Sequence, residues 1–451
     1  MFARMKSNSY FFVLILFITS CQKKELVKEV TITNWEFREQ GGEWLTATIP
    51  GFVHLDLYDN GLIEDPFYRD NENKLQWIEE KSWEYKSEFT LDSEFLKNNS
   101  ISLNFSGIDT YADIYLNNSL IKSCDNFFLA YNIEVGTLLK TNNELRLVFR
   151  PSTQIAKDLA EKHPYELPAE ERVYIRKPQF HFGWDWGPKL IGCGITEEVK
   201  LIASNTAQIS DFYVKTVSIS DSIARMSLEL ELSNIDDRDY SIDFLGETYR
   251  VESENTSIEF SVGNPDLWWP RGYGEQNFQN LQVNLLNDDG DIISQIHEQY
   301  AIRQIDLIQE EDELGKGFKF QVNGQDIYAK GANWIPLDFF HTRVDSKQYR
   351  KALSDVAEAN MNMLRVWGGG IYEDEYFYDL CDSLGIMVWQ DFMFACAMYP
   401  GGEKFMGSVK LEATQQIKRL RKHPSIALWC GNNENSEGWH RWGWQANRSE
   451  D

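Results

Sequence analysis

Short runs of alternating apolar and polar residues, each ending at turn residues, fill the first part of the chain. One run carries an apolar residue at every second position: Leu145, Leu147 and Phe149. This period of two is typical of a strand that buries one face. Another run, Ala112–Leu116, leads into two consecutive asparagines, a pattern that favours a hairpin turn. Strands at this spacing predict an antiparallel jelly-roll β-sandwich over residues 21–203.

The alternation is cleaner over residues 204–304. Three leucines at every second position, Leu228, Leu230 and Leu232, are separated by Glu229 and Glu231. One face of this strand is therefore expected to be buried and the other solvated. Asp289-Gly290 is a strong signal for a hairpin turn. We expect an immunoglobulin-like β-sandwich that lacks the disulfide.

From residue 305 onward the hydrophobic period changes. Apolar strands are predicted at Ile327–Ile335, Met363–Trp367, Ile386–Phe392 and Ile426–Cys430. Amphipathic helices are predicted between them: one after Asp345-Ser346, one ending near Leu384-Gly385, and one carrying Val409, Ala413, Ile417 and Leu420 on its apolar face. Alternating strands and helices indicate a parallel sheet. A (β/α)₈ TIM barrel needs about 250 residues, so residues 305–451 are expected to supply strands one to four of such a barrel.

Functional groups of a barrel lie at the C-terminal ends of its strands. The predicted ends carry Asn333-Trp334, Arg365, Trp367, Gln390-Asp391 and, after the fourth strand, Asn433-Glu434. Glu434 is a natural general acid for protonating a leaving glycosidic oxygen. The amide of Asn433 can hydrogen-bond a sugar hydroxyl. The alternative is that Asn432-Asn433-Glu434-Asn435 is only a helix-capping turn.

Tryptophans surround these positions. Trp367, Trp439, Trp442 and Trp444 are candidate stacking platforms for a sugar, although buried tryptophans more often belong to a core. Trp367 is the strongest candidate, because three glycines follow it and allow close approach of backbone and ligand.

A second constellation is Phe180–Pro188, in which Asp185 stands between Trp184 and Trp186. Trp184 and Asp185 are candidate substrate contacts, with the Asp185 carboxylate accepting hydrogen bonds from sugar hydroxyls. Alternatively, Asp185 caps its own turn.

Composition narrows the classes of function. Hydrophobic residues make up 42% of the 451 residues and charged residues 25%, which indicates folded domains rather than disorder. The formal charge of −26 argues against nucleic acid as a partner. The six cysteines and seven histidines are scattered, so we expect no metal site, no disulfide framework and no cofactor.

The N-terminus has the pattern of an export signal. Arg4 and Lys6 precede the apolar run Tyr10–Thr19, and Ser20-Cys21 follows at once. We expect residues 1–20 to be a lipoprotein signal peptide and Cys21 to carry the lipid; a plain signal peptide is the alternative. Such an exported protein would be membrane-anchored through Cys21, in the periplasm or outer membrane of a Gram-negative bacterium.

Six motifs together resemble glycoside hydrolase family 2, and specifically the N-terminal part of its β-mannosidase branch. The motifs are Ile49-Pro50-Gly51, Phe180–Pro188, Leu267-Trp268-Trp269-Pro270, Gly331-Ala332-Asn333-Trp334, Met363–Gly370 and Trp429–Glu434. The resemblance implies a retaining exo-β-mannosidase that removes terminal β-linked mannose from β-mannoside oligosaccharides.

The resemblance also implies residue roles. Glu434 matches the acid/base and Asn433 the residue at the 2-hydroxyl. Trp367 and Trp442 match pocket aromatics, and Asp185 matches the aspartate that the sandwich contributes. The family's nucleophilic glutamate follows strand seven, and no residue matches it here, so this chain alone is expected to be inactive. Two alternatives stay open: another family 2 exo-glycosidase (β-galactosidase, β-glucuronidase or exo-glucosaminidase), and a non-catalytic carbohydrate-binding lipoprotein.

Overall fold

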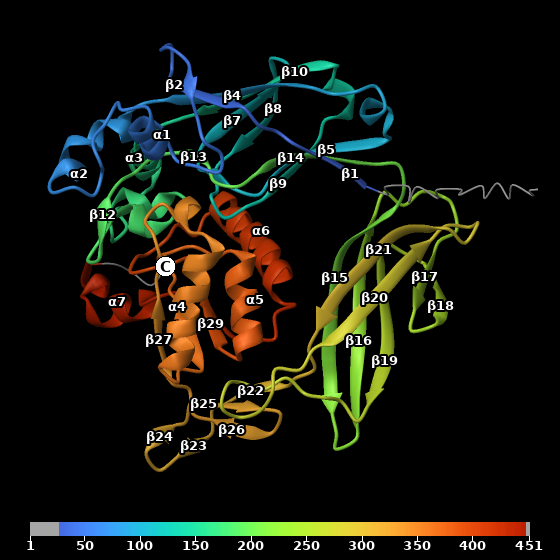
Figure 1. The fold of residues 1–451 in the computed structure, drawn as a ribbon. Coiled ribbons are helices and arrows are strands. Elements are labelled where there is room, and N and C mark those ends of the chain that lie inside the picture. Colours follow the sequence, from blue (N-terminus) through green and yellow to red (C-terminus); the bar gives the residue numbers. More distant parts are fainter. Residues whose placement is uncertain (1–26, 448–451) are drawn as a thin grey trace, which may run out of the picture.

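A computed structural model describes residues 27–447, which form three parts: an N-terminal sandwich, a second sandwich beside it, and a parallel sheet covered by helices (Figure 1). The expected signal peptide and Cys21 lie outside the described residues. Among the helices that the structure describes, none combines the length and apolar character needed to cross a bilayer.

The N-terminal sandwich consists of two antiparallel sheets. The smaller sheet has the order β1 (Val27–Thr31), β14 (Val199–Ser204), β5 (Ser100–Phe105) and β9 (Tyr131–Glu134). The larger has the order β3 (Leu45–Thr46), β2 (Trp35–Glu39), β4 (Trp83–Thr90), β10 (Asn142–Phe149), β7 (Ala112–Leu116) and β8 (Ser119–Cys124). The alternating residues of β10 face the core as expected: Leu145, Leu147 and Phe149 are at most 1% exposed.

The turn between β7 and β8 confirms the prediction from the paired asparagines. Asn117 and Asn118 have φ angles of 51° and 65°, the left-handed conformation that a two-residue hairpin turn requires. Short elements decorate the sandwich: α1 (Val53–Asp59), α2 (Asn71–Lys74), α3 (Ser152–Lys162), the strand pair β6 (Ile108–Asp109) and β13 (Gly194–Ile195), and the hairpin of β11 (Phe182–Trp184) and β12 (Gly187–Lys189).

The second sandwich also has two antiparallel sheets. One is β15 (Gln208–Ile219), β16 (Ile223–Ser233) and β19 (Asn255–Gly263). The other is β18 (Glu247–Arg250), β17 (Ser241–Phe244), β20 (Gln279–Leu286) and β21 (Ile292–Tyr300). The predicted alternation in β16 holds, since its three leucines are buried and Glu229 and Glu231 face outward. Gly290, with φ 81°, turns the chain from β20 into β21.

A small antiparallel sheet links this sandwich to the helical part: β22 (Ile305–Ile308), β25 (Lys319–Val322) and β26 (Gln325–Ile327), with the hairpin β23 (Glu311–Asp312) and β24 (Gly315–Lys316). The predicted single strand Ile327–Ile335 is wrong. It is divided between β26 and β27 (Gly331–Trp334), because the backbone around Lys330 turns to bond the Asn362 side chain instead of continuing the antiparallel ladder.

The last part is a four-stranded parallel sheet in chain order: β27, β28 (Met363–Val366), β29 (Met387–Asp391) and β30 (Ile426–Cys430). Helices α4 (Ser346–Glu358), α5 (Glu375–Leu384) and α6 (Glu403–Leu420) connect the strands. Asp345 caps α4 with a full capping box, and Gly385 ends α5 in the left-handed conformation with φ 70°. The helix α7 (Asn435–Arg441) follows β30.

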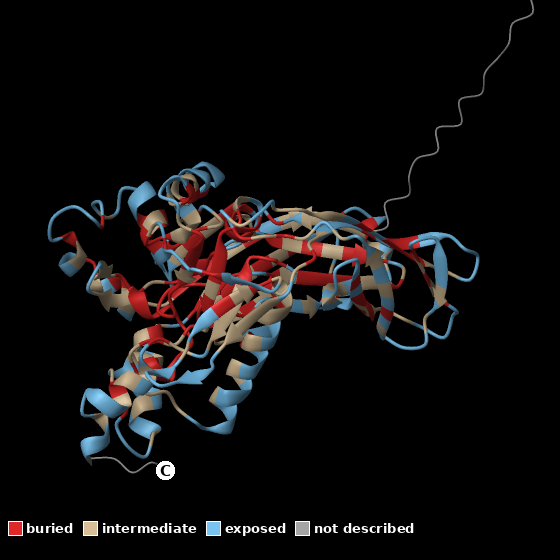
Figure 2. Cartoon of the chain, turned by 90° about the horizontal axis from the view of Figure 1, so that it is seen from below, coloured by how far each residue is buried: buried red, intermediate tan, exposed pale blue. Residues whose placement is uncertain are grey.

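The N-terminal sandwich and the parallel sheet share one hydrophobic core, which runs from Ile32 in the sandwich to Ile426 in β30. Buried residues accordingly gather along the inner strands, while the outer helix faces are exposed (Figure 2). Polar contacts cross the same interface, the most buried being the ion pair of Arg176 with Glu412 on α6.

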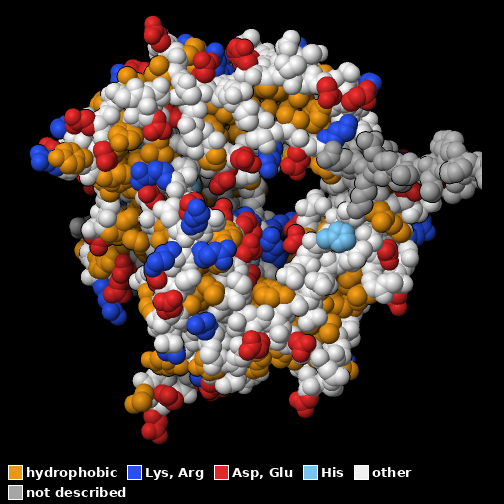
Figure 3. Space-filling view, viewed as in Figure 1, with side chains coloured by type: hydrophobic (Ala, Val, Ile, Leu, Met, Phe, Trp, Pro, Cys, Tyr) orange, Lys and Arg blue, Asp and Glu red, His pale blue; other side chains and the backbone are white. Residues whose placement is uncertain are grey.

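Charge pairs link the second sandwich to the end of α6. Arg421 contacts Asp211 at 2.7 Å and Lys418 contacts Glu231 at 2.5 Å. Figure 3 shows an opening where the three parts of the molecule meet, with basic and acidic side chains gathered beside it. These ion pairs hold part of the second sandwich against the end of α6. Each pair near the surface contributes little to the free energy of folding.

His423, just before β30, lies in a charge network with residues of α5. Its Nδ1 is 2.6 Å from Asp382 Oδ2 and its Nε2 is 3.2 Å from Glu375 Oε2. Burial alone would lower the pKa of His423, but the hydrogen bonds and charges of Asp382 and Glu375 outweigh it and raise the pKa to about 9. His423 is therefore a charged imidazolium at neutral pH.

We predict a pH-dependent contribution of His423 to stability. Since the folded pKa lies above the unfolded value, the stabilisation is complete below about pH 6.5 and is lost as the pH rises through 9. His423→Gln should therefore lower the free energy of unfolding by roughly 3 kcal/mol more at pH 6 than at pH 10, as measured by urea denaturation. The exposed His297, substituted in the same way, is the control; equal losses at both pH values for His423→Gln would contradict the assignment.

Candidate active site

Arg365 at the end of β28 connects three neighbouring strand ends. Its guanidinium donates to Asp391 Oδ2 at 2.7 Å, to Asn433 Oδ1 at 2.8 Å and to Asn333 Oδ1 at 3.1 Å. Adjacent strands of a parallel sheet place their C-terminal ends at one edge, which is why residues so distant in sequence meet here. Arg365 fixes the orientation of the Asn433 amide.

Asp391 at the end of β29 holds Arg365 in place. Its side chain is fully buried, and it accepts hydrogen bonds from Arg365, from Trp389 Nε1 at 2.9 Å and from the Gly368 backbone at 3.0 Å. Burial raises the pKa of Asp391, while the charge of Arg365 and these hydrogen bonds act in the opposite direction. Asp391 therefore serves to hold Arg365 and the glycine-containing turn after Trp367.

Glu434 is exposed at the rim of this group of residues. Its Oε2 accepts a hydrogen bond from Asn433 Nδ2 at 3.1 Å and lies 3.3 Å from Cys396 Sγ. The backbone of Glu434 has φ 61°, a left-handed conformation that is uncommon for glutamate. Such conformations cluster at functional sites, where the surrounding structure holds them in place.

The backbone of Glu434 does occupy the N-cap position of α7, but its side chain makes no capping hydrogen bond. The neighbouring Asn432 supplies a turn contact instead, since its Oδ1 accepts from the Asn435 backbone at 3.1 Å. The carboxylate of Glu434 is turned toward Asn433 and Cys396 and remains accessible. The helix-capping alternative therefore does not explain the Glu434 side chain.

The N-terminal sandwich contributes the β11–β12 hairpin to the same region. Trp184 meets the Trp367 ring edge-on at a centroid distance of 4.9 Å, and Trp186 meets it at 6.0 Å. Trp367 itself is only 7% exposed. Asp185 stands at the exposed tip of the hairpin, and its carboxylate accepts no hydrogen bond from residues 27–447, so it does not cap its own turn.

Arg172, also from the sandwich, connects the hairpin to the loop after β29. It donates to the Cys396 carbonyl at 3.1 Å and the Ala395 carbonyl at 3.4 Å, and its guanidinium lies 5.3 Å from the centroid of the Trp184 ring. Burial lowers the pKa of Arg172. The region thus combines an accessible carboxylate, an oriented amide and aromatic rings, a combination suited to binding and protonating a sugar.

Comparison with known proteins identifies the family of this chain. A family profile described as "Glycosyl hydrolase 2 galactose-binding domain-like" matches residues 35–197, and "Glycosyl hydrolases family 2" matches residues 207–303. The chain belongs to glycoside hydrolase family 2. The two matched regions correspond to the two β-sandwiches, so the sandwich and immunoglobulin-like parts of the predicted fold are confirmed.

Proteins similar to this family 2 chain include several named as β-mannosidases. Beta-mannosidase B of Emericella nidulans is 37% identical over 430 residues, covering 90% of this chain and 51% of the relative. Beta-mannosidase of Mus musculus is 38% identical over 423 residues, covering 87% and 48%. The crystal structure of a beta-D-mannosidase from Dictyoglomus thermophilum aligns with a TM-score of 0.87 and 42% identity, covering 92% and 53%. The chain spans about half the length of these relatives.

Asn433 contacts Glu434, and Trp184 packs on Trp367. Arg172 links Trp184 to the Cys396 loop, which contacts Glu434, and Asp185 lies at the exposed tip of the Trp184 hairpin. Trp442 is placed differently: it is 45% exposed, packs edge-on against Trp444, and has no ring contact or hydrogen bond with the strand-end residues within the described chain. Its predicted role in the pocket stays a prediction.

Three neighbours of the site were not predicted: Cys396, Arg172 and Trp186. Trp186 could have been predicted from the Trp-Asp-Trp pattern, because both tryptophans flank Asp185 in the same way. Cys396 and Arg172 lie in loops without a regular period, and no local signal in the sequence marks them.

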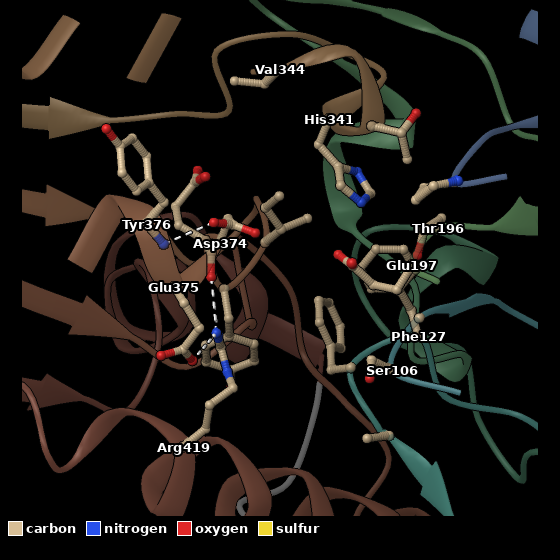
Figure 4. Close-up of a pocket in the computed structure, with 18 of the residues that line it drawn as sticks. Ser106, Phe127, Thr196, Glu197, His341, Val344, Asp374, Glu375, Tyr376 and Arg419 are labelled. Carbon is tan, nitrogen blue, oxygen red and sulfur yellow. Dashed lines mark hydrogen bonds and ion pairs between the residues drawn. The ribbon is translucent and has the colours of Figure 1, made fainter. Parts of the chain in front are cut away.

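A separate pocket of about 560 Å³ lies between the N-terminal sandwich and helices α4 to α6 (Figure 4). Glu197 and His341 lie on one side of it, and Arg419, which contacts Glu375 at 2.9 Å, lies on the other. None of its lining residues belongs to the group around Glu434, so this pocket is not part of the candidate active site.

One group of potential metal ligands occurs within residues 27–447: Asp379, Asp382 and His423. Metal binding needs a neutral imidazole with a free lone pair. Because the pKa of His423 is raised to about 9, its ring is protonated at neutral pH and pairs with the carboxylates instead. In this structure His423 is hydrogen-bonded to Asp382 and Glu375.

We predict that Gly369 is required for the tryptophan cluster. A Cβ at Gly369 would overlap the Trp367 ring, and the Gly369 carbonyl accepts a hydrogen bond from the Phe180 backbone at 3.1 Å. Gly369→Ala should change the near-UV circular dichroism of the tryptophans and cost about 1–3 kcal/mol of stability, as for other overpacked sites. Gly401→Ala, where the Cβ would meet open space, is the matched control. An unchanged spectrum for Gly369→Ala would show that the rings are not held as described.

Proposed function

We propose that this chain supplies the acid/base part of a retaining exo-β-mannosidase, which removes terminal β-D-mannose from β-mannoside oligosaccharides. The observation that carries the proposal is the accessible carboxylate of Glu434 beside the oriented amide of Asn433, directly after the fourth parallel strand. The names of the relatives as β-mannosidases support the choice of mannose.

The four parallel strands are, in this proposal, the first half of a (β/α)₈ barrel. Their parallel order and the helices between them support it. We use "full-length enzyme" for a polypeptide that carries this chain and extends to the length of its relatives. We also propose that the domains meet at residues 203/204 and 304/305, as predicted from the sequence.

In the proposed reaction Glu434 first donates a proton to the glycosidic oxygen while a second carboxylate attacks the sugar carbon. Retaining enzymes hold these two groups about 5–5.5 Å apart and form a covalent glycosyl-enzyme. Glu434 then acts as base on the water that releases mannose. The resemblance assigns the second carboxylate to a glutamate after strand seven.

Binding of the sugar is assigned to groups on both sides of the interface. Asn433 would contact the 2-hydroxyl of mannose, and the Trp184–Trp367 cluster would provide an apolar wall. Asp185 is proposed to accept hydrogen bonds from sugar hydroxyls, because its carboxylate is exposed at the hairpin tip and has no protein partner within residues 27–447. Trp442, which follows α7, remains a candidate contact for the sugar.

We also propose that the protein is an exported lipoprotein, anchored to a membrane through Cys21. The pattern of basic residues, an apolar run and Ser20-Cys21 supports this. The proposed location is the periplasm or outer membrane of a Gram-negative bacterium.

The role of Glu434 can be tested in the full-length enzyme. Glu434→Ala should lower hydrolysis of natural linkages by about 10²–10⁴-fold and hydrolysis of activated aryl mannosides far less, because good leaving groups depart without a proton. Azide needs no base, so it should restore turnover and yield a β-mannosyl azide.

Glu437 on α7 offers the matched control, since it is also a glutamate and pairs with Arg441. Glu437→Ala should leave the dependence on leaving group unchanged. If Glu434→Ala instead causes a modest loss that is independent of the leaving group and gives no azide product, Glu434 is not the acid/base.

Anchoring is tested separately. Cys21→Ala should move the protein from the membrane fraction to the soluble fraction, because it removes the acceptor of the lipid. The measurement is immunoblotting of fractionated cells, with Cys124→Ala, a buried sandwich cysteine, as the control. Soluble wild-type protein would contradict the lipoprotein proposal.

A further inference from the structure

The thiol of Cys396 contacts both residues of the Asn433–Glu434 pair. Its Sγ lies 3.3 Å from Glu434 Oε2, to which it donates, and it accepts a hydrogen bond from Asn433 Nδ2 at 3.2 Å. Asn433 Nδ2 in turn donates to the same Glu434 oxygen at 3.1 Å. The three groups form a closed triangle in which the carboxylate receives two hydrogen bonds on one oxygen. The other oxygen stays available at the surface.

The backbone of Cys396 is fixed to the same segment. The Cys396 N–H donates to the Asn433 carbonyl at 2.9 Å, and the Asn433 N–H donates to the Phe394 carbonyl at 2.8 Å. These bonds extend the pairing of β29 and β30 past the ends of the strands. Cys396 also has a left-handed backbone, with φ 47°, as Glu434 does with φ 61°. Two unfavourable conformations in contact indicate a loop geometry that packing and hydrogen bonds enforce.

A second anchor for Cys396 comes from the N-terminal sandwich. Arg172 donates to the carbonyls of Ala395 and Cys396, and its guanidinium also packs on Trp184. The loop that carries the thiol is therefore held from the side that contributes the tryptophan hairpin. The position of the thiol depends on sandwich and parallel sheet together.

The chemistry of this thiol suits a hydrogen-bond donor and not a nucleophile. Burial, together with the hydrogen bond to and the charge of Glu434, raises the pKa of Cys396 to about 12. The group is therefore protonated across the neutral range, and little of the reactive thiolate is present. Cys430, at the end of β30, differs: its thiol lies 3.4 Å from the Asn432 carbonyl and also interacts with Trp389 and Asp391, and among the described residues it has no contact with Glu434.

We propose that Cys396 is a positioning residue for the acid/base: its thiol donates to Glu434 and, together with Asn433, sets the direction of the carboxylate. The inference rests on the proposed function of Glu434. It implies that the loop after β29 helps to align the proton donor, and that the N-terminal sandwich does so through Arg172. A thiol is a weak donor, so it orients the carboxylate while binding its charged form less strongly than a hydroxyl or amide would.

The contact itself is tested on this chain without any activity. Alkylation of individual cysteines by iodoacetamide at pH 8.5 is followed by peptide mass spectrometry in wild type, Glu434→Gln and Glu437→Gln. Loss of the Glu434 charge should let the Cys396 thiol ionise more readily and speed its alkylation by roughly 3–10-fold. Glu437→Gln should have no effect, and Cys430 should react equally in all three proteins. An unchanged Cys396 rate in Glu434→Gln, or a parallel rise at Cys430, would overturn the proposal.

The consequence for catalysis is tested in the full-length enzyme with Cys396→Ser and Cys396→Ala. Serine keeps a donor and should retain activity within about threefold, whereas alanine should lower kcat for poor leaving groups about tenfold and spare activated aryl mannosides. Alanine should also move the alkaline limb of the pH profile to higher pH, because the ionised carboxylate loses a hydrogen bond. Equal losses in both variants, or no loss in either, would overturn the positioning role. A wild-type enzyme inactive on β-mannosides would refute the proposed function alone, since the alkylation result still decides the contact.

Discussion

The buried ion pair of Arg176 with Glu412 is the constraint on which the candidate site depends. Both side chains are 2% exposed, and their two hydrogen bonds measure 2.9 and 2.6 Å. Asn126 and Tyr372 bond the same carboxylate at 3.1 and 3.2 Å. Loss of one partner from such a pair leaves a buried charge and costs about 3–5 kcal/mol. The pair therefore fixes where the N-terminal sandwich docks on α6 and its neighbours.

Docking in this position has a direct effect on the site. It places the β11–β12 hairpin over the end of β28, so that Trp184 and Trp186 meet Trp367. It also places Arg172 against the carbonyls of the loop after β29. The strand ends alone supply a carboxylate and an amide on an open edge. The sandwich adds the aromatic rings and a second anchor, so the candidate binding region lies between two folded units that share one core.

Much of this arrangement could be predicted from the sequence, because the relevant signals are local. The hairpin at Asn117, the cap at Asp345 and the end of α5 at Gly385 each depend on the backbone preference of one residue, and all three were found where the sequence places them. The fourth parallel strand, Ile426–Cys430, was predicted with its observed bounds. The site residue Glu434 could be nominated because strand ends of parallel sheets meet at one edge.

What could not be predicted depends on contacts between distant segments. The predicted strand at Ile327 was wrong because the Asn362 side chain, 32 residues from Lys330 in sequence, bonds the backbone there. The role of Cys396 depends on a side-chain contact across 38 residues, and that of Arg172 on one across 224. Hydrophobic periodicity reports which face of an element is buried, and it carries no information about which loops meet.

The choice of mannose as substrate is the central claim, and the most direct test is the specificity of the full-length enzyme. The ratio of kcat/KM values for an aryl β-mannoside and the matching β-galactoside, β-glucuronide and β-glucosaminide measures how the site discriminates between transition states. We expect the β-mannoside to be favoured by at least about 10²-fold, because a site that hydrogen-bonds a substrate hydroxyl discriminates strongly against sugars that lack it in that position. A preference for any of the other three sugars, or hydrolysis of none of the four, would contradict the account.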